Sequence, residues 1–189
     1  MLDRLRGKLG DATLRLGAGA SRVIPSPTVW TVIGLLFAFI SAYTFSVSTS
    51  PWQMIAGVSL LLSGFLDIVD GAVARSSNKT SKRGSFLDST LDRAGEVAVF
   101  LGIMQGGYSP ALLVLLTLAL SLLVSYTRAK ADSLGVSLAG IGVGERSERI
   151  LVLGLTSVFG LLFYGLVIVS VLAAITFVER MYRVSAALR

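Results

Sequence analysis

The 189-residue chain is 53% hydrophobic and only 15% charged, with a mean hydropathy of +0.78. This apolar fraction exceeds what a soluble domain of this length can bury, so we expect an integral membrane protein. The chain contains no Cys and no His, which excludes disulfides, thiolate or histidine metal sites and Cys-His or Ser-His-Asp catalysis. Its net charge of +6 lacks the pattern of nucleic-acid binding, and we expect no nucleic-acid partner.

The N-terminal segment combines helical apolar spacing with scattered positive charge. Leu5, Leu9 and Leu16 recur at helical spacing opposite basic residues such as Arg15. This pattern is typical of an amphipathic helix that lies on a membrane surface. We therefore expect residues 1–26 to form a juxtamembrane amphipathic helix with its N-terminal tail, and an ordinary solvated basic tail is the alternative.

The rest of the chain, residues 27–189, is predicted to be one all-α membrane domain, a bundle of six transmembrane helices. A helix needs roughly 20 apolar residues to cross the hydrocarbon core, and the length of each apolar stretch sets the predicted spans. Pro27, Pro51 and Pro110 suit helix starts. The six predicted spans are residues 28–47, 52–75, 84–105, 111–132, 147–163 and 165–182.

The basic residues are distributed unevenly among the predicted connections. The loops after spans one, three and five contain no Lys or Arg. All 17 basic residues lie at the N-terminus, in the even-numbered loops, at the C-terminus or at the adjacent span ends. Because Lys and Arg favour the cytoplasmic side, we expect a multi-pass protein of the plasma membrane with both termini in the cytoplasm.

Four aspartates lie at the predicted cytoplasmic ends of spans two and three. Asp67 and Asp70 are spaced i,i+3, and Asp88 and Asp92 are spaced i,i+4, so each pair shares one helix face. An aspartate at bilayer depth costs about 2.5–3.5 kcal/mol, so four together need cations. Oxygen ligands favour Mg²⁺ or Mn²⁺, and two such ions could clamp a phosphoryl group.

Small residues accompany these acids. Gly71 and Ala74 leave room for a ligand to approach the helix backbone, and Gly84 permits a turn. A buried ion-pair network between the two helices, with Arg75 and Arg93 as counter-charges, is the alternative. It does not explain the small residues between the acids.

A second polar group is predicted at the same cytoplasmic end. Arg128 lies near the end of span four, Arg146 and Arg149 open span five, and Arg180 lies near the end of span six. Guanidinium groups that converge beside a metal site suggest an acceptor that itself carries phosphate. The alternative is that these cations only fix the topology or contact lipid headgroups.

The acidic stretch resembles the complete signature of the CDP-alcohol phosphotransferase family. This resemblance implies an enzyme that transfers a substituted phosphate from a CDP-linked alcohol to a second alcohol and releases CMP. It also implies a homodimer. The eight fixed positions all occur at the family's spacing, as Asp67-x2-Asp70-Gly71-x2-Ala74-Arg75-x8-Gly84-x3-Asp88-x3-Asp92.

The same resemblance implies a role for each of these residues. Asp67, Asp70 and Asp88 would be the principal metal ligands. Asp92 would be a further ligand or the catalytic base that takes the proton of the acceptor hydroxyl. The residues that would contact the CDP group are Asp67, Asp70, Gly71, Ala74, Arg75, Gly84 and Asp88.

The runs at residues 125–132 and 145–149 resemble those of the branch that uses inositol phosphate. This branch comprises the phosphatidylinositol phosphate synthases of bacteria and the archaetidylinositol phosphate synthases of archaea. The resemblance implies CDP-diacylglycerol or CDP-archaeol as the lipid donor and inositol 1-phosphate as the acceptor. The residues expected to hold the acceptor phosphate are Arg128, Arg146, Arg149 and Arg180.

Two alternative functions remain at this point. A phosphatidylglycerophosphate synthase is less favoured, because Ser89 and Arg93 stand where glycerol-phosphate-using relatives usually have Pro and Lys. A divalent-cation transporter would need polar groups through to the far side of the bilayer. The outer halves of the predicted spans carry no charge, which favours the enzyme.

Overall fold

The structure, a computed structural model, describes residues 2–47 and 50–188, and the side chains of residues 13–47 and 51–188. The described residues form seven α-helices and no β-strand, in agreement with the predicted all-α class. The helices are α1 (Leu2–Val23), α2 (Pro27–Ser46), α3 (Ser50–Ser76), α4 (Lys82–Gln105), α5 (Ala111–Ser133), α6 (Arg146–Val158) and α7 (Leu162–Ala187).

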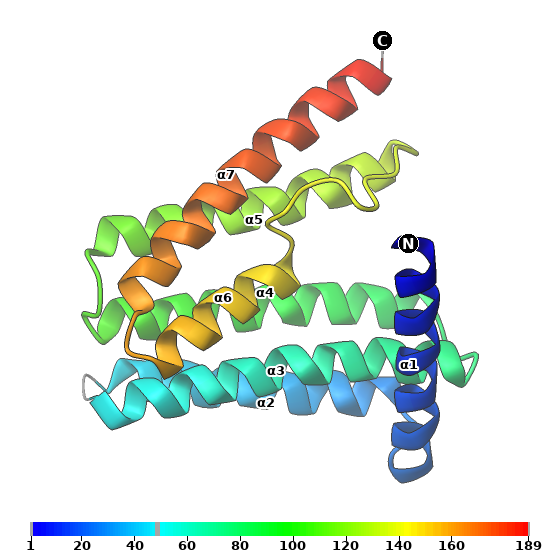
Figure 1. The fold of residues 1–189 in the computed structure, drawn as a ribbon, viewed down its shortest axis with the longest axis horizontal. Helices are drawn as coiled ribbons and strands as arrows, with labels where there is room; N and C mark the ends of the chain where they lie inside the picture. Colours follow the sequence, from blue (N-terminus) through cyan, green and yellow to red (C-terminus); the bar gives the residue numbers. More distant parts are fainter. Residues whose placement is uncertain (1, 48–49, 189) are drawn as a thin grey trace.

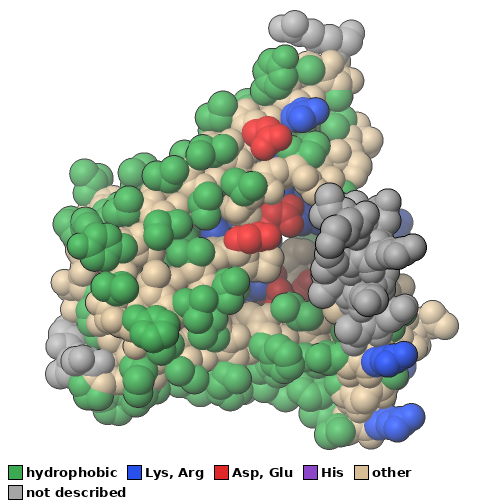
Figure 2. All heavy atoms as spheres, viewed as in Figure 1, with side chains coloured by type: hydrophobic (Ala, Val, Ile, Leu, Met, Phe, Trp, Pro, Cys, Tyr) green, Lys and Arg blue, Asp and Glu red, His purple; other side chains and the backbone are tan. Residues whose placement is uncertain are grey.

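The helices form a bundle in which α2 packs on both α3 and α4, α6 packs on α3, and α5 packs on α7 (Figure 1). The apolar core lies in the half of the bundle farthest from the described chain ends. Phe45, Phe100, Ile103 and Leu166 are buried there. Charged side chains gather in the other half, where the surface is hollowed beside α1 (Figure 2). The bundle therefore has an apolar end and a polar end.

Four of the described helices, α2, α3, α5 and α7, are long and apolar enough to cross a membrane. Helix α4 carries Asp88, Asp92, Arg93 and Glu96 in its first four turns, which lowers its hydropathy. Helix α6 has only 13 residues and is about 20 Å long at 1.5 Å per residue. The described helices thus support a multi-pass membrane protein, and the count of six spans stays a prediction.

The predicted fifth span is wrong at its C-terminal end. Helix α6 ends at Val158, whereas the prediction extended it to residue 163, because the apolar run continues beyond Gly160. Gly160 adopts a φ of +72°, and the N–H of Leu161 donates to Thr156 O at 2.6 Å. This is a Schellman motif, in which glycine takes the left-handed conformation and ends the helix. Helix α7 then begins at Leu162.

The same motif ends α3 at the connection that joins the two acidic helices. Asn78 has a φ of +53°, and the Lys79 N–H donates to Ala74 O at 3.0 Å. Asn is one of the few residues other than glycine that adopt this conformation readily. The Ser81 hydroxyl then accepts from the Gly84 N–H at 3.0 Å and caps α4. This short connection brings the acids of α3 and α4 to one depth.

Helix α1 crosses the end of α3 instead of running alongside it (Figure 1). The crossing is close at Gly17, where a Cβ would collide with the Ala72 carbonyl. A helix lies at residues 2–23, as predicted. Most of the predicted apolar face, at residues 2–12, lies outside the described side chains, and Leu16 of that face is 36% exposed. The position of the helix on a membrane surface stays a prediction.

The polar end of the bundle carries the described chain ends and the connections α3–α4 and α5–α6 (Figure 1). The turns at residues 106–110 and 159–161 lie at the opposite end. The connections that have Lys or Arg in them or on the adjoining helix ends therefore share one end, as the charge distribution predicts. Exposed apolar side chains such as Leu36, Leu112 and Ile168 cover the outside of the helices, a surface suited to lipid.

Candidate active site

Three aspartates from two helices form a compact group at the polar end. Asp67 and Asp70 come from α3 and Asp88 comes from α4, and each offers a carboxylate oxygen within 4.8 Å of the other two. Asp70 is buried, with 5% of its surface exposed. Within the described part of the chain, Asp70 Oδ2 and Asp88 Oδ1 are buried without a hydrogen-bond partner. Such oxygens are costly unless a cation meets them, so this group fits a hard divalent ion.

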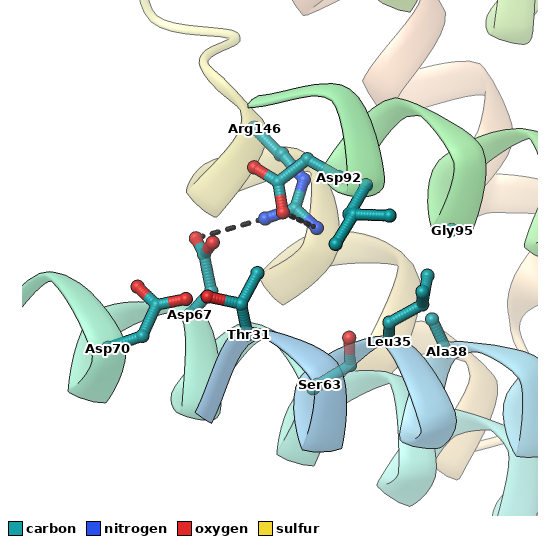
Figure 3. A pocket seen from close by; sticks show the side chains of 11 residues that line it. Thr31, Leu35, Ala38, Ser63, Asp67, Asp70, Asp92, Gly95 and Arg146 are labelled. Carbon is teal, nitrogen blue, oxygen red and sulfur yellow. Dashed lines mark ion pairs between the residues drawn. The ribbon is translucent and has the colours of Figure 1, made fainter. Parts of the chain in front are cut away.

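Asp92 lies outside this group and is joined to it by Arg146 (Figure 3). Arg146 Nη1 lies 2.9 Å from Asp67 Oδ2, and Arg146 Nη2 lies 2.9 Å from Asp92 Oδ1. Arg93 Nη1 adds a looser contact with Asp92 Oδ2 at 3.8 Å. The structure therefore gathers the four predicted aspartates, three as one group and the fourth through a guanidinium that holds its orientation.

A cleft of about 270 Å³ opens beside the acid group, between the start of α2, the end of α3 and the start of α4. Arg75 lies over Gly71, where a Cβ would come within 3.2 Å of its Nη1. Lys79 Nζ donates to Pro25 O at 2.9 Å and ties the α3–α4 connection to the segment before α2. Six of the seven residues predicted to contact CDP line this one cleft: Asp70, Gly71, Ala74, Arg75, Gly84 and Asp88.

Two of the four predicted acceptor-binding arginines are fully buried. Arg149 donates through Nε and Nη2 to Glu96 Oε1 at 3.2 and 2.7 Å, and through Nη1 to Gly144 O at 2.8 Å. Arg180 donates to Ile141 O, Val124 O and Glu145 Oε1 at 3.0, 2.9 and 2.7 Å, in that order. Each buried guanidinium is thus neutralised by one glutamate. Arg149 is 2% exposed and Arg180 is 1% exposed.

The other two predicted acceptor-binding arginines differ from these and from each other. Arg128 is half-exposed and lies 3.6 Å from Glu145 Oε1, so it shares this glutamate with Arg180. Arg146 contacts Asp67 and Asp92 instead. The structure therefore brings Arg128 and Arg180 together and turns Arg146 toward the acids.

Three polar residues near the site were not predicted from the sequence. Glu96 follows Asp92 by four residues, and this helical spacing could have indicated a shared face. Glu145 directly precedes Arg146, which gives no indication of its contact with α7. Thr31 of α2 lines the cavity beside Asp67 and Asp70 (Figure 3), and nothing in its sequence surroundings marks it.

Comparison with known proteins places this arrangement in a family. A model described as CDP-alcohol phosphatidyltransferase matches residues 25–182. The chain belongs to the CDP-alcohol phosphatidyltransferase family. The match begins just after α1 and extends well into α7, so it includes every acid and arginine of the candidate site. Membership confirms the predicted family and the predicted enzyme class.

Individual members of the CDP-alcohol phosphatidyltransferase family are similar over most of the chain. The archaetidylinositol phosphate synthase of Pyrococcus horikoshii is 37% identical over 182 residues, which cover 96% of this chain and 95% of that protein. The crystal structure of Mycobacterium tuberculosis phosphatidylinositol phosphate synthase with CDP-DAG bound has a TM-score of 0.74 at 26% identity, covering 91% of this chain and 92% of that chain. Both similar proteins belong to the predicted branch.

A second structure of the M. tuberculosis enzyme, in complex with manganese and citrate, has a TM-score of 0.75 at 25% identity and covers 91% of this chain and 88% of that chain. Manganese is one of the two ions expected from the oxygen-only ligands of this chain. The group formed by Asp67, Asp70 and Asp88 is where this CDP-alcohol phosphatidyltransferase can hold such an ion.

Proposed function

We propose that this chain transfers a phosphatidyl or archaetidyl group from a CDP-linked lipid to inositol 1-phosphate and releases CMP. The observation that carries the proposal is the group of Asp67, Asp70 and Asp88 beside the cleft that Arg75 and the small residues of the signature line. The similarity to inositol-phosphate-using synthases along nearly the whole chain supports the acceptor.

The surroundings of the acid group support a lipid donor. An apolar groove of about 360 Å³ runs between α3 and α6 and reaches Asp67. Phe65, Ile68 and Leu151 line it and are about half-exposed. A CDP-linked lipid can therefore lay its diphosphate at the acids, its cytidine in the adjoining cleft and a hydrocarbon chain along this groove. Ester and ether chains are both apolar, and either suits the groove.

The metal cofactor would be held by Asp67, Asp70 and Asp88. The buried oxygens of Asp70 and Asp88 that have no partner among the described residues, together with the absence of Cys and His from the chain, favour Mg²⁺ or Mn²⁺. We propose two ions, with Asp92 available as a further ligand. When bound, these ions would draw charge from the diphosphate oxygens and make CMP a better leaving group.

Asp92 is the proposed catalytic base. The chain has no His or Cys, which favours a carboxylate as the group that takes the proton from the acceptor hydroxyl. Arg146 fixes one Asp92 oxygen at 2.9 Å, and the second contacts Arg93 only loosely at 3.8 Å. This second oxygen is the one available to the acceptor. The hydroxyl oxygen would then attack the lipid-linked phosphorus, and CMP would leave with the bonding electron pair.

The acceptor's phosphate is proposed to bind at Arg128, Arg149 and Arg180, with Arg146 between them and the acids. Residues Arg128 and Arg180 share Glu145, which supports a single anion site between α5 and α7. A phosphate there would meet planar guanidinium donors, which recognise its oxygens in pairs.

The membrane arrangement remains part of the proposal. We propose residues 27–189 as one domain that spans the plasma membrane, with both termini and the active site at the cytoplasmic face. The two connections at that end (Figure 1), with the basic residues in them or on the adjoining helix ends, support this orientation. We also propose that α1 lies on that face and that the protein is a homodimer, as the family resemblance implies.

CMP release from purified protein tests the proposed function. CDP-diacylglycerol or CDP-archaeol would be supplied with inositol 1-phosphate, free inositol, serine or glycerol 3-phosphate, with and without Mg²⁺. We expect metal-dependent release with inositol 1-phosphate. Release with glycerol 3-phosphate alone would instead favour a phosphatidylglycerophosphate synthase. Cation uptake into proteoliposomes without CMP release would favour a transporter.

A further inference from the structure

Glu145 is the carboxylate that two of the proposed acceptor-binding arginines share. Its Oε1 lies 2.7 Å from Arg180 Nη2 and 3.6 Å from Arg128 Nη1. The first distance is that of a charge-assisted hydrogen bond, and the second is too long for any hydrogen bond. One carboxylate oxygen therefore serves Arg180 well and Arg128 poorly.

The backbone just before Glu145 is held by side chains of α6 and α7. Thr176 Oγ1 of α7 accepts from the N–H groups of Val143 and Gly144 at 3.1 and 2.9 Å. The Gly144 carbonyl accepts from Arg149 Nη1 at 2.8 Å. Because these bonds anchor the chain just before Glu145, a change at this residue requires only rotation of its side chain.

Arg180 donates hydrogen bonds to three described residues, and Glu145 is the one whose accepting group can move. The other two are the backbone carbonyls of Val124 and Ile141. The Arg180 side chain is 1% exposed, whereas the Glu145 side chain is 29% exposed. An incoming anion can therefore take the place of Glu145 at Arg180 without breaking a backbone hydrogen bond.

We propose that Glu145 occupies the position of the acceptor's phosphate and rotates away when the acceptor binds, an inference that rests on the proposed function. A phosphate monoester carries a charge of roughly −1.5 to −2 at pH 7 and three strong acceptor oxygens. It can therefore bond to Arg128 and Arg180 at once, which a single carboxylate oxygen does not do. The exchange replaces the single negative charge of Glu145 beside the two arginines with the larger charge of the phosphate, so the two positive charges are balanced better once the acceptor is bound.

The pair of Glu96 and Arg149 differs and does not exchange. Two donors of Arg149 converge on one Glu96 oxygen, and the two side chains are only 9% and 2% exposed. Separating them would leave two buried charges unpaired. When the acceptor binds, the Glu145 side chain therefore rotates away from Arg180, and Glu96 remains paired with Arg149.

Kinetics of Glu145→Gln test this exchange. The neutral amide competes less for Arg180, so we expect the KM for inositol 1-phosphate to fall severalfold while the KM for the CDP-lipid stays unchanged. The inhibition constant of inorganic phosphate should fall in parallel. Glu179→Gln is the matched control, because Glu179 pairs with exposed Arg183 one helical turn further along α7. This substitution should leave both constants unchanged.

A higher or unchanged acceptor KM in active Glu145→Gln would overturn the exchange and make Glu145 a fixed support of Arg180. If that variant does not fold, Glu145→Asp keeps the charge but reaches less far toward Arg180. Its acceptor KM should also fall, and a KM at or above that of the wild type contradicts the inference. Failure of the wild-type protein to use inositol 1-phosphate would instead refute the proposed function itself.

Discussion

The acid group and the arginine group lie at the same end of the bundle but differ in how their polar atoms are satisfied. The acid group keeps buried oxygens on Asp70 and Asp88 without a partner in the described chain. In the arginine group, Arg149 and Arg180 each contact a glutamate and backbone carbonyls. Unpaired carboxylates can receive a cation directly, whereas Arg180 must exchange Glu145 before it binds an anion.

We expect the largest effect from a substitution in the acid group, at Asp88. Asp88→Asn removes one of three proposed ligands, so we expect CMP release to fall to the background and the affinity for Mn²⁺ to fall about 10-fold or more. Activity assays and Mn²⁺ titration of the purified protein measure both. Glu179→Gln, a carboxylate outside the site, is the control. Normal Mn²⁺ binding by Asp88→Asn would remove this residue from the ligand set.

Asp92→Asn separates the proposed base from the metal group. Loss of a general base should lower kcat by about 10²–10⁴-fold, because the amide cannot accept the acceptor's proton. Binding of the CDP-lipid should remain detectable, since Asp67, Asp70 and Asp88 are untouched. Steady-state kinetics and binding of the labelled donor test these two statements separately. Normal turnover would refute the assignment of Asp92 as base.

Arg149→Ala tests the arginine group, in which the buried polar atoms have partners. This change leaves Glu96 buried without its partner, so we expect a loss of about 3–5 kcal/mol in unfolding free energy. The acceptor KM should also rise, because Arg149 is one of the proposed phosphate ligands, and an unchanged KM in a folded variant would remove it from that set. Thermal unfolding in detergent gives the stability, and Arg183→Ala, which breaks only an exposed pair, is the control. Equal stability losses in the two variants would contradict the buried role of Arg149.

Arg128→Ala should have the smallest effect. Arg128 is half-exposed and 3.6 Å from Glu145, so its loss should leave stability nearly unchanged. Its proposed contact with the acceptor predicts a roughly tenfold higher acceptor KM, which corresponds to about 1.4 kcal/mol. An unchanged KM would return Arg128 to a role in topology or headgroup contact.

The acid group could be predicted from sequence because it lies in one local stretch. The helical spacings of Asp67 with Asp70 and of Asp88 with Asp92 place each pair on one face, and the short connection at Asn78 brings the pairs together. Helical spacing and one short connection were therefore sufficient to predict that the four aspartates lie together.

The arginine group could be predicted only in part, because its contacts join helices far apart in the chain. Arg146 reaches the acids since α6 packs on α3, a contact that no local spacing encodes. Pairing of Glu145 with Arg180 similarly depends on how the α5–α6 connection lies on α7. The end of α6 was missed for a different reason, since the apolar run conceals the left-handed Gly160.

Mass analysis of the lipid product tests the central claim most directly. Purified protein would receive a CDP-linked lipid, inositol 1-phosphate and Mg²⁺. We predict a new lipid with the mass of the donor less CMP plus inositol phosphate, formed only with the metal present. CMP release without a lipid product, or a lipid product only with a different acceptor, would contradict the account.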